Sequence, residues 1–208
     1  MELLSIGALL LAVVLSLDLL AVSFAYGSEK IKIPFKSNII ITVIGSTVLA
    51  LSVYLGNFIS LILPYTITDI IGSSILFILG IIKIFDSVIK GYIRKNGKIS
   101  KNMNFSIFSL KFAINVYADP KKADIDNSRI ISSNEAIIVA FAVALDAVAL
   151  GVGAALIEIS FIQLIMFSLI FDVLAVLIGS FLGRSLAQKS PINLSWLGGI
   201  ILIILSFL

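Results

Sequence analysis

Three aspartates lie inside long apolar stretches of this sequence, where an acidic side chain is costly. Asp146 is close to the middle of the stretch Glu135–Ile157, and Asp18 and Asp172 lie well inside two others. An aspartate at the centre of a membrane helix costs about 2.5–3.5 kcal/mol on insertion scales, so such residues are mostly functional. A carboxylate at this depth stays protonated or is neutralised by a bound cation. The three aspartates are therefore candidate ligands of a transported metal ion; the alternative is protonated side chains that hydrogen-bond across helices for packing.

The sequence contains no cysteine and no histidine, which limits the chemistry of any metal site. Disulfides and iron–sulfur centres are excluded, and dedicated zinc, copper or nickel sites are disfavoured. Oxygen ligands alone favour Mn²⁺, Mg²⁺ or Ca²⁺. Because carboxylates release protons when they bind a metal, such a site could exchange a metal ion for protons. We predict no permanently bound cofactor, with a divalent cation such as Mn²⁺ as substrate.

A second group of acidic residues lies just before the stretch that contains Asp146. From Asp124 to Glu135, oxygen-bearing groups have the spacing of an EF-hand calcium loop. The departure is Arg129, where the turn favours glycine with positive φ, and no second loop is present to pair with Ile131. Ser132 followed by Glu135 is also a capping box at a helix start, so a calcium site and a capped, solvated loop both remain open. The candidate Ca²⁺ ligands are Asp124, Asp126, Ser128, the carbonyl of Ile130, Ser132 and Glu135.

The composition indicates that apolar helices position these residues. Of the 208 residues, 60% are hydrophobic and 13% are charged, and the mean hydropathy is +1.17. A soluble domain would carry about 25% charged residues. Apolar runs of about 20 residues recur along the chain, which predicts an all-α polytopic membrane protein with a single membrane domain. The net charge of +3 comes mostly from loop lysines, so it reports membrane topology and not nucleic-acid binding. The first run is too long for the apolar core of a signal peptide and is expected to be a retained helix.

Six transmembrane helices are predicted from these runs. Lys83 and Asp86 lie near the end of the third helix, where we expect them to pair with each other at the membrane interface. We expect no basic residue near the three intramembrane aspartates. The expected ranges are Leu3–Tyr26, Asn38–Leu63, Ile67–Ile89, Glu135–Ile157, Phe161–Leu182 and about Ile192 to the end of the chain.

The basic residues predict how the chain is oriented. The loops after the first, third and fifth helices hold nearly all lysines and arginines, while those after the second and fourth hold none. By the positive-inside rule, the basic loops are cytoplasmic and both termini lie outside. The chain then divides into helices 1–3 (1–90), a basic cytoplasmic loop (91–134) and helices 4–6 (135–208). Within that loop, Phe105–Tyr117 alternates loosely and is either a strand or an interfacial segment.

The two halves of the chain resemble each other. The matching positions are Asp18 with Asp146, Gly56 with Gly183, and Ile71-Gly72 with Leu197-Gly198. Each half has three helices, an odd number, so the second copy must be inverted relative to the first. Inverted repeats are a transporter architecture with the site near the midplane, where we expect the two matching aspartates to meet. Asp172 corresponds to about Gly45, so the predicted site is asymmetric.

These residues resemble a known family. The segment Asp119–Gly153, and to a lesser degree Ser16–Gly27, is similar to the YtaF-type sporulation membrane proteins, which are relatives of the MntP-type manganese efflux pumps. The resemblance covers essentially the whole chain. It implies six spans in the cell membrane of a spore-forming bacterium and, for the pumps, Mn²⁺ export through acids in helices 1 and 4, which Asp18 and Asp146 match. The pumps carry a further acid in helix 2, where this chain has Gly45.

The sequence therefore predicts a sporulation-associated divalent cation transporter and not an enzyme. The alternative is a non-transporting sporulation membrane factor whose calcium-responsive loop recruits partners. An intramembrane aspartyl protease is disfavoured because Leu17-Asp18 and Leu145-Asp146 lack the YD and GxGD contexts. The expected partners are membrane lipid and a divalent cation, with a homo-oligomer left open and no nucleic acid.

Overall fold

The computed structural model is helical throughout the residues that it describes. These are residues 2–96, 124–157, 159–186 and 195–207. Within them the chain forms six α-helices and no strand, apart from an isolated bridge between Lys32 and Ile130. The helices are α1 (Glu2–Ser28), α2 (Phe35–Ile62), α3 (Tyr65–Asn96), α5 (Ser133–Leu156), α6 (Phe161–Leu186) and α7 (Ser195–Leu205).

Five of the described helices are long and apolar enough to cross a membrane. A bilayer core about 30 Å thick needs about 20 apolar residues, and each of the five segments has at least 21. The helix α7 is described over only 11 residues, so its described part is too short to count as the sixth predicted span. The chain is a multi-pass helical membrane protein. The candidate spans are Ile6–Ser28, Phe35–Ile62, Tyr65–Phe85, Ser133–Leu156 and Phe161–Ser185.

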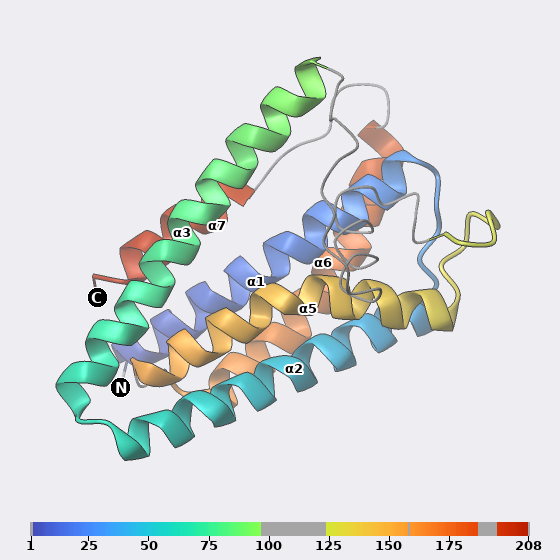
Figure 1. The fold of residues 1–208 in the computed structure, drawn as a ribbon. Helices are drawn as coiled ribbons and strands as arrows, with labels where there is room; N and C mark the ends of the chain where they lie inside the picture. The colour runs from blue at the N-terminus through green and yellow to red at the C-terminus, as the bar shows by residue number, and fades with distance from the viewer. Residues whose placement is uncertain (1, 97–123, 158, 187–194, 208) are drawn as a thin grey trace, which may run out of the picture.

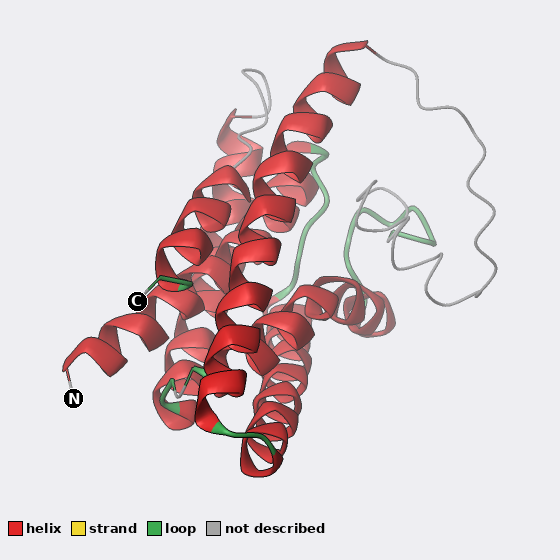
Figure 2. Ribbon diagram, turned by 60° about the vertical axis from the view of Figure 1, so that its left-hand side comes forward, coloured by secondary structure: helices red, strands yellow, loops and turns green. Residues whose placement is uncertain are grey.

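The helices pack mainly in pairs. The most extensive contacts are between α1 and α6 and between α2 and α5, and α3 packs against α7 and α5. Figure 1 shows α3 and α7 together on one side of the other four helices, and Figure 2 shows the same arrangement after a turn. Large apolar side chains such as Phe58, Leu61 and Phe181 are exposed on the outside, as contact with lipid tails requires.

Glycines bring the paired helices close together. The predicted GxxxG pair of α6, Gly179 and Gly183, faces α1, and a Cβ atom on Gly179 would lie 2.6 Å from a carbonyl oxygen of α1. In the other pair, a Cβ on Gly56 of α2 would lie 2.6 Å from the Cβ of Ala155 on α5. Side chains at these positions would force the helices apart, which is why small residues mark membrane helix interfaces. The close contacts fix the positions of the helices that carry the aspartates.

The third helix is longer than predicted. It continues to Asn96, beyond the expected end at Ile89, so Lys83 lies well inside α3 and not near its end. The predicted starts and ends of the first, second, fourth and fifth helices are within a few residues of the structure. Residues 97–123, including Phe105–Tyr117 and most of the predicted basic loop, lie outside the described residues.

Candidate functional site

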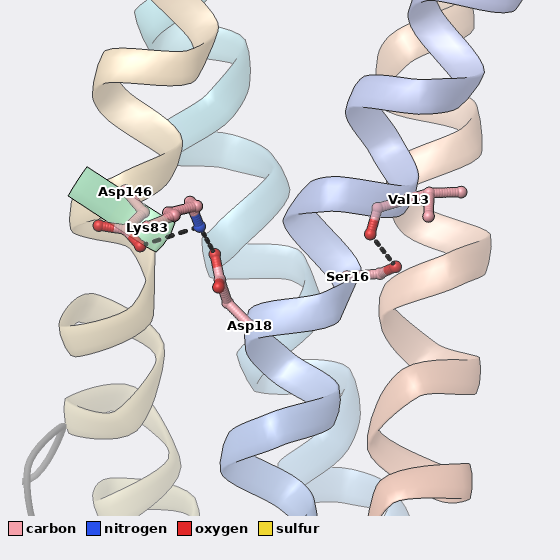
Figure 3. Close-up of polar contacts among 5 residues, drawn as sticks. All are labelled: Val13, Ser16, Asp18, Lys83 and Asp146. Atoms are coloured by element: carbon pink, nitrogen blue, oxygen red, sulfur yellow. Dashed lines mark hydrogen bonds and ion pairs between the residues drawn. The ribbon is translucent and has the colours of Figure 1, made fainter. Parts of the chain in front are cut away.

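Lys83 of α3 joins two of the three predicted aspartates. Its ammonium group donates a hydrogen bond to Asp18 Oδ2 on α1 and lies 3.3 Å from Asp146 Oδ2 on α5 (Figure 3). Lys83 and Asp18 are 7% and 6% exposed, whereas the Asp146 side chain is 40% exposed. The two aspartates of the sequence repeat are therefore brought together, but through a lysine that bridges them.

This bridge corrects two expectations from the sequence. We expected Lys83 to be an interfacial residue, and we expected no base near the intramembrane aspartates; the side chain of Asp86, its expected partner, lies outside the described residues. Instead, Lys83 is buried and its ammonium contacts Asp18 and Asp146. The physical reason is that α3 continues beyond Lys83 to Asn96 and packs against α5, which brings the ammonium to the aspartates. A buried ammonium needs charged partners because desolvating an ion costs several kcal/mol.

A small cavity lies beside Asp18, between α1, α2, α5 and α6. Its volume of about 30 Å³ is enough for one or two water molecules. The polar side chains in its wall are Asp18, Asp172 and Ser168, and the remaining wall is apolar or glycine. Gly45 of α2 is one of these wall residues, and a Cβ atom added there would meet nothing within 4 Å. Asp146 is not part of the cavity wall.

Asp172 of α6 presents a carboxylate to the same cavity. The residue is 4% exposed, and its Oδ2 accepts a hydrogen bond of 2.9 Å from the Ser168 hydroxyl one turn earlier. Its Oδ1 has no hydrogen-bond partner among the described residues. A buried carboxylate oxygen without a partner is costly unless a proton, a water molecule or a cation compensates it. Asp172 and Asp18 thus line the same small cavity.

Further buried polar groups surround the site. Ser16, two residues before Asp18, donates its hydroxyl to the Val13 carbonyl (2.8 Å), so it is used within α1 (Figure 3). Asn38 of α2 is fully buried and donates from Nδ2 to the Val173 carbonyl on α6 (3.3 Å). Asn38 was not among the predicted site residues, although it lies four residues before Thr42 and continues a polar stripe at helical period. Thr42 donates to Asn38 Oδ1 (3.4 Å).

The predicted calcium loop is a compact acidic cluster. Carboxylate oxygens of Asp124, Asp126 and Glu135 all lie within 4.8 Å of one another. Asp124 and Glu135 are buried, while Asp126 is exposed. Hydrogen bonds from the side chain and backbone of Ser128 hold the pKa of Asp126 below its usual range. Arg129 has φ 59°, so it adopts the left-handed conformation that this position of an EF-hand loop needs.

The capping box is also present at the start of α5. The Ser132 hydroxyl accepts a hydrogen bond from the Glu135 backbone (3.4 Å), and Glu135 Oε2 accepts one from the Ser132 backbone (2.8 Å). Glu135 Oε1 accepts a further hydrogen bond from the Ile125 backbone (2.7 Å). Glu135 therefore makes the capping box, and its carboxylate also belongs to the acidic cluster.

Comparisons with known proteins agree with the family resemblance. The family model described as "Putative manganese efflux pump" (Mntp) matches residues 87–208. The chain is 32% identical over 203 residues to "Probable sporulation protein YtaF" of Bacillus subtilis (strain 168), and the match covers 95% of each protein. No solved structure matches this chain significantly.

Proposed function

Since this chain belongs to the MntP family of manganese efflux pumps, as a YtaF-type member, we propose that it is a divalent cation transporter whose substrate is Mn²⁺. The observation that carries this proposal is a cation position inside the helix bundle. The Lys83 ammonium is held between Asp18 and Asp146, and the neighbouring cavity is lined by Asp18 and Asp172. Hard carboxylate oxygens without nitrogen or sulfur ligands suit Mn²⁺.

Lys83 acts in this proposal as a tethered cation that occupies the site when metal is absent. Two unit charges 4 Å apart interact by about 4 kcal/mol at an effective dielectric constant of 20. The ammonium and a metal ion beside Asp18 would repel each other on this scale. The metal ion must therefore displace the ammonium to contact Asp18. A lysine suits this role because its ammonium sits on a flexible four-carbon chain and its pKa responds readily to burial. Metal binding would then release Lys83 from Asp18, and metal departure would let it return.

We further propose that the two halves are inverted repeats, and the helix contacts support this relation. At the offset between Asp18 and Asp146, Ser23 corresponds to Gly151. At the offset between Gly56 and Gly183, Ser52 corresponds to Gly179. A Cβ on Gly179 would lie 3.0 Å from the Ser23 Cβ between α1 and α6, and one on Gly151 would lie 2.7 Å from the Ser52 Cβ between α2 and α5. The same contact thus occurs in both pairs with the serine and glycine exchanged between partners.

The orientation follows from the charged loops. We place the α1–α2 connection, with Lys30, Lys32 and Lys36, in the cytoplasm of a bacterial cell, and the N-terminus outside. The relative's name connects it with sporulation, and we extend that association to this chain. Export of Mn²⁺ across the cell membrane is the direction that the family description indicates.

The proposal is tested by Mn²⁺ flux into or out of proteoliposomes containing the purified protein. We expect Asp18→Asn to abolish Mn²⁺ flux, because Asp18 contacts Lys83 and also lines the cavity. Asp69→Asn is the matched control, since Asp69 is exposed at the start of α3. Unchanged flux in Asp18→Asn would refute this site. No flux with the wild-type protein, together with a sporulation defect on deletion, would favour a non-transporting sporulation factor.

Gly45 offers a second test of the same cavity. Gly45→Asp would add a carboxylate where a Cβ atom meets nothing within 4 Å, beside Asp18 and Asp172. We expect tighter Mn²⁺ binding in Gly45→Asp than in Gly45→Asn, which has nearly the same shape without the charge. Equal Mn²⁺ affinity in the two variants would show that the metal does not enter this cavity.

A further inference from the structure

We propose that residues 124–135 form a Ca²⁺ site, separate from the proposed transport site. The segment precedes α5 and ends in its first turn, where the candidate span Ser133–Leu156 begins. Its three acidic residues, Asp124, Asp126 and Glu135, have no lysine or arginine within ion-pair distance among the described residues. The inference does not depend on Mn²⁺ transport.

Several of the oxygens that an EF-hand spacing assigns to the ion are close to one another. The three carboxylates approach within 4.8 Å of one another. The Ser128 hydroxyl oxygen is 3.0 Å from the Ile130 carbonyl oxygen, which are the groups at positions 5 and 7. The Ser132 hydroxyl at position 9 is 2.9 Å from Glu135 Oε2 at position 12. Six oxygen-bearing groups from one short segment match the coordination number of Ca²⁺.

Asp124 supplies the observation that a capped, solvated loop does not explain. The residue is 7% exposed, and its Oδ2 accepts a hydrogen bond from the Arg129 backbone (2.9 Å). Its Oδ1 is buried and has no hydrogen-bond partner among the described residues. A buried, unpartnered carboxylate oxygen beside two other carboxylates is unfavourable, and a bound cation would compensate all three at once. The capping box with Ser132 explains the burial of Glu135 but not the burial of Asp124.

The backbone of the loop has the turn that such a site needs. Arg129 has φ 59° at position 6, and its backbone N–H points to the carboxylate at position 1. A left-handed conformation is strained for arginine and is retained here by the surrounding hydrogen bonds. Arg129, the departure from the EF-hand pattern, therefore adopts the conformation that glycine has at this position.

Position 8 of the loop is paired, although the chain has no second EF-hand loop. The Ile131 backbone N–H donates to the Lys32 carbonyl (2.9 Å), and the Lys32 N–H donates to the Arg129 carbonyl (2.8 Å). The Ser37 hydroxyl of α2 donates to the Ile131 carbonyl (2.7 Å). The α1–α2 connection thus takes the place of a partner loop. A Ca²⁺ ion here would strengthen the attachment of α5 to that connection.

The test is calorimetric titration of the full-length protein in detergent with Ca²⁺. We expect one Ca²⁺ per chain with a Kd on the order of 10⁻⁴ M, the weak end of the EF-hand range, because of the strained turn. Binding should weaken at least about tenfold in Asp124→Asn and in Glu135→Gln, and should persist in Asp18→Asn. Glutamine at position 135 preserves the capping box, so the helix start is kept.

Arg129→Gly is the variant expected to bind more tightly. It removes a positive side chain near the ion and supplies the residue that adopts positive φ without strain. We expect a several-fold gain in Ca²⁺ affinity and a larger rise of Tm in Ca²⁺ than in the wild-type protein. The proposal is overturned if neither the wild-type protein nor Arg129→Gly binds Ca²⁺ at millimolar concentration. It is equally overturned if Asp124→Asn binds as the wild type does.

Discussion

Two groups of three acidic residues in this chain are compensated in different ways. In the interior of the helix bundle, Asp18 and Asp146 share the ammonium of Lys83. In the loop before α5, Asp124 and Glu135 instead accept hydrogen bonds from backbone N–H groups. The difference arises because helices use up their backbone N–H groups internally, so that inside a membrane only a side chain or an ion can compensate a carboxylate.

The comparison implies different sensitivities. In the interior group one ammonium contacts two aspartates, and its loss removes that contact from both. The loop group depends on several backbone hydrogen bonds, and no single side chain supplies them all. We therefore expect the largest effects of mutation at Lys83 and the smallest at Asp126.

Removal of the Lys83 ammonium should have the largest effect. Lys83→Met removes the ammonium that contacts Asp18 and Asp146, and breaking a buried pair typically costs about 3–5 kcal/mol. Unfolding of the purified protein in detergent measures this change. Lys36→Met is the control, because Lys36 is exposed and should stay within about 0.5 kcal/mol of the wild type. If Lys83→Met were as stable as the wild type, the interior group would not be more sensitive to mutation than the loop group.

The two partners of Lys83 should differ from each other. Asp18 is 6% exposed and Asp146 is 40% exposed in its side chain. Asp18→Asn should therefore destabilise the protein by about 2–3 kcal/mol, because Asp18 is the more buried of the two partners. Asp146→Asn should cost less, because Asp146 is less buried and its Oδ2 lies 3.3 Å from the ammonium. The same unfolding measurement compares them. A larger loss in Asp146→Asn would mean that it is the main partner of Lys83.

Glu135 should tolerate glutamine better than alanine. Glu135→Ala leaves the N–H groups of Ile125 and Ser132 without an acceptor and removes half of the capping box, at a cost of about 1–2 kcal/mol. Glu135→Gln retains an acceptor oxygen and should lose only a fraction of that. Unfolding without Ca²⁺ gives the values. Equal losses in the two variants would show that the negative charge, and not the hydrogen bonds, stabilises the loop.

Acid pH should act on the loop through the exposed carboxylate of Asp126. Because hydrogen bonds from Ser128 lower the pKa of Asp126 in the folded chain, its contribution is present above the ordinary carboxyl pKa of about 4. That contribution is lost as the pH falls through the lowered value. Hydrogen-exchange protection of the Ser128 amide should decline over this range in the wild type. In Asp126→Asn the protection of the Ser128 amide should be low and independent of pH. If it declined as in the wild type, a group other than Asp126 would cause the pH dependence.

Much of this molecule could be predicted from its sequence. Apolar length located the helices, and the repeat of Leu-Asp singled out Asp18 and Asp146. The role of Lys83 could not be predicted, because a lysine near an expected helix end usually extends toward the interface. Only the full length of α3 and its packing against α7 and α5 decide otherwise. The pairing of Ile131 with Lys32 could not be predicted either, since no local pattern connects residues so far apart in the chain.

The bridge at Lys83 also bears on how the chain is made. Lys83 and Asp18 both belong to the first three helices, which leave the ribosome before α5. Each would be costly to insert into the bilayer alone, by about 2.5–3.5 kcal/mol on insertion scales. If they meet as soon as α3 enters the membrane, the nascent half neutralises its own charges. Asp146 then joins a pair that is already assembled.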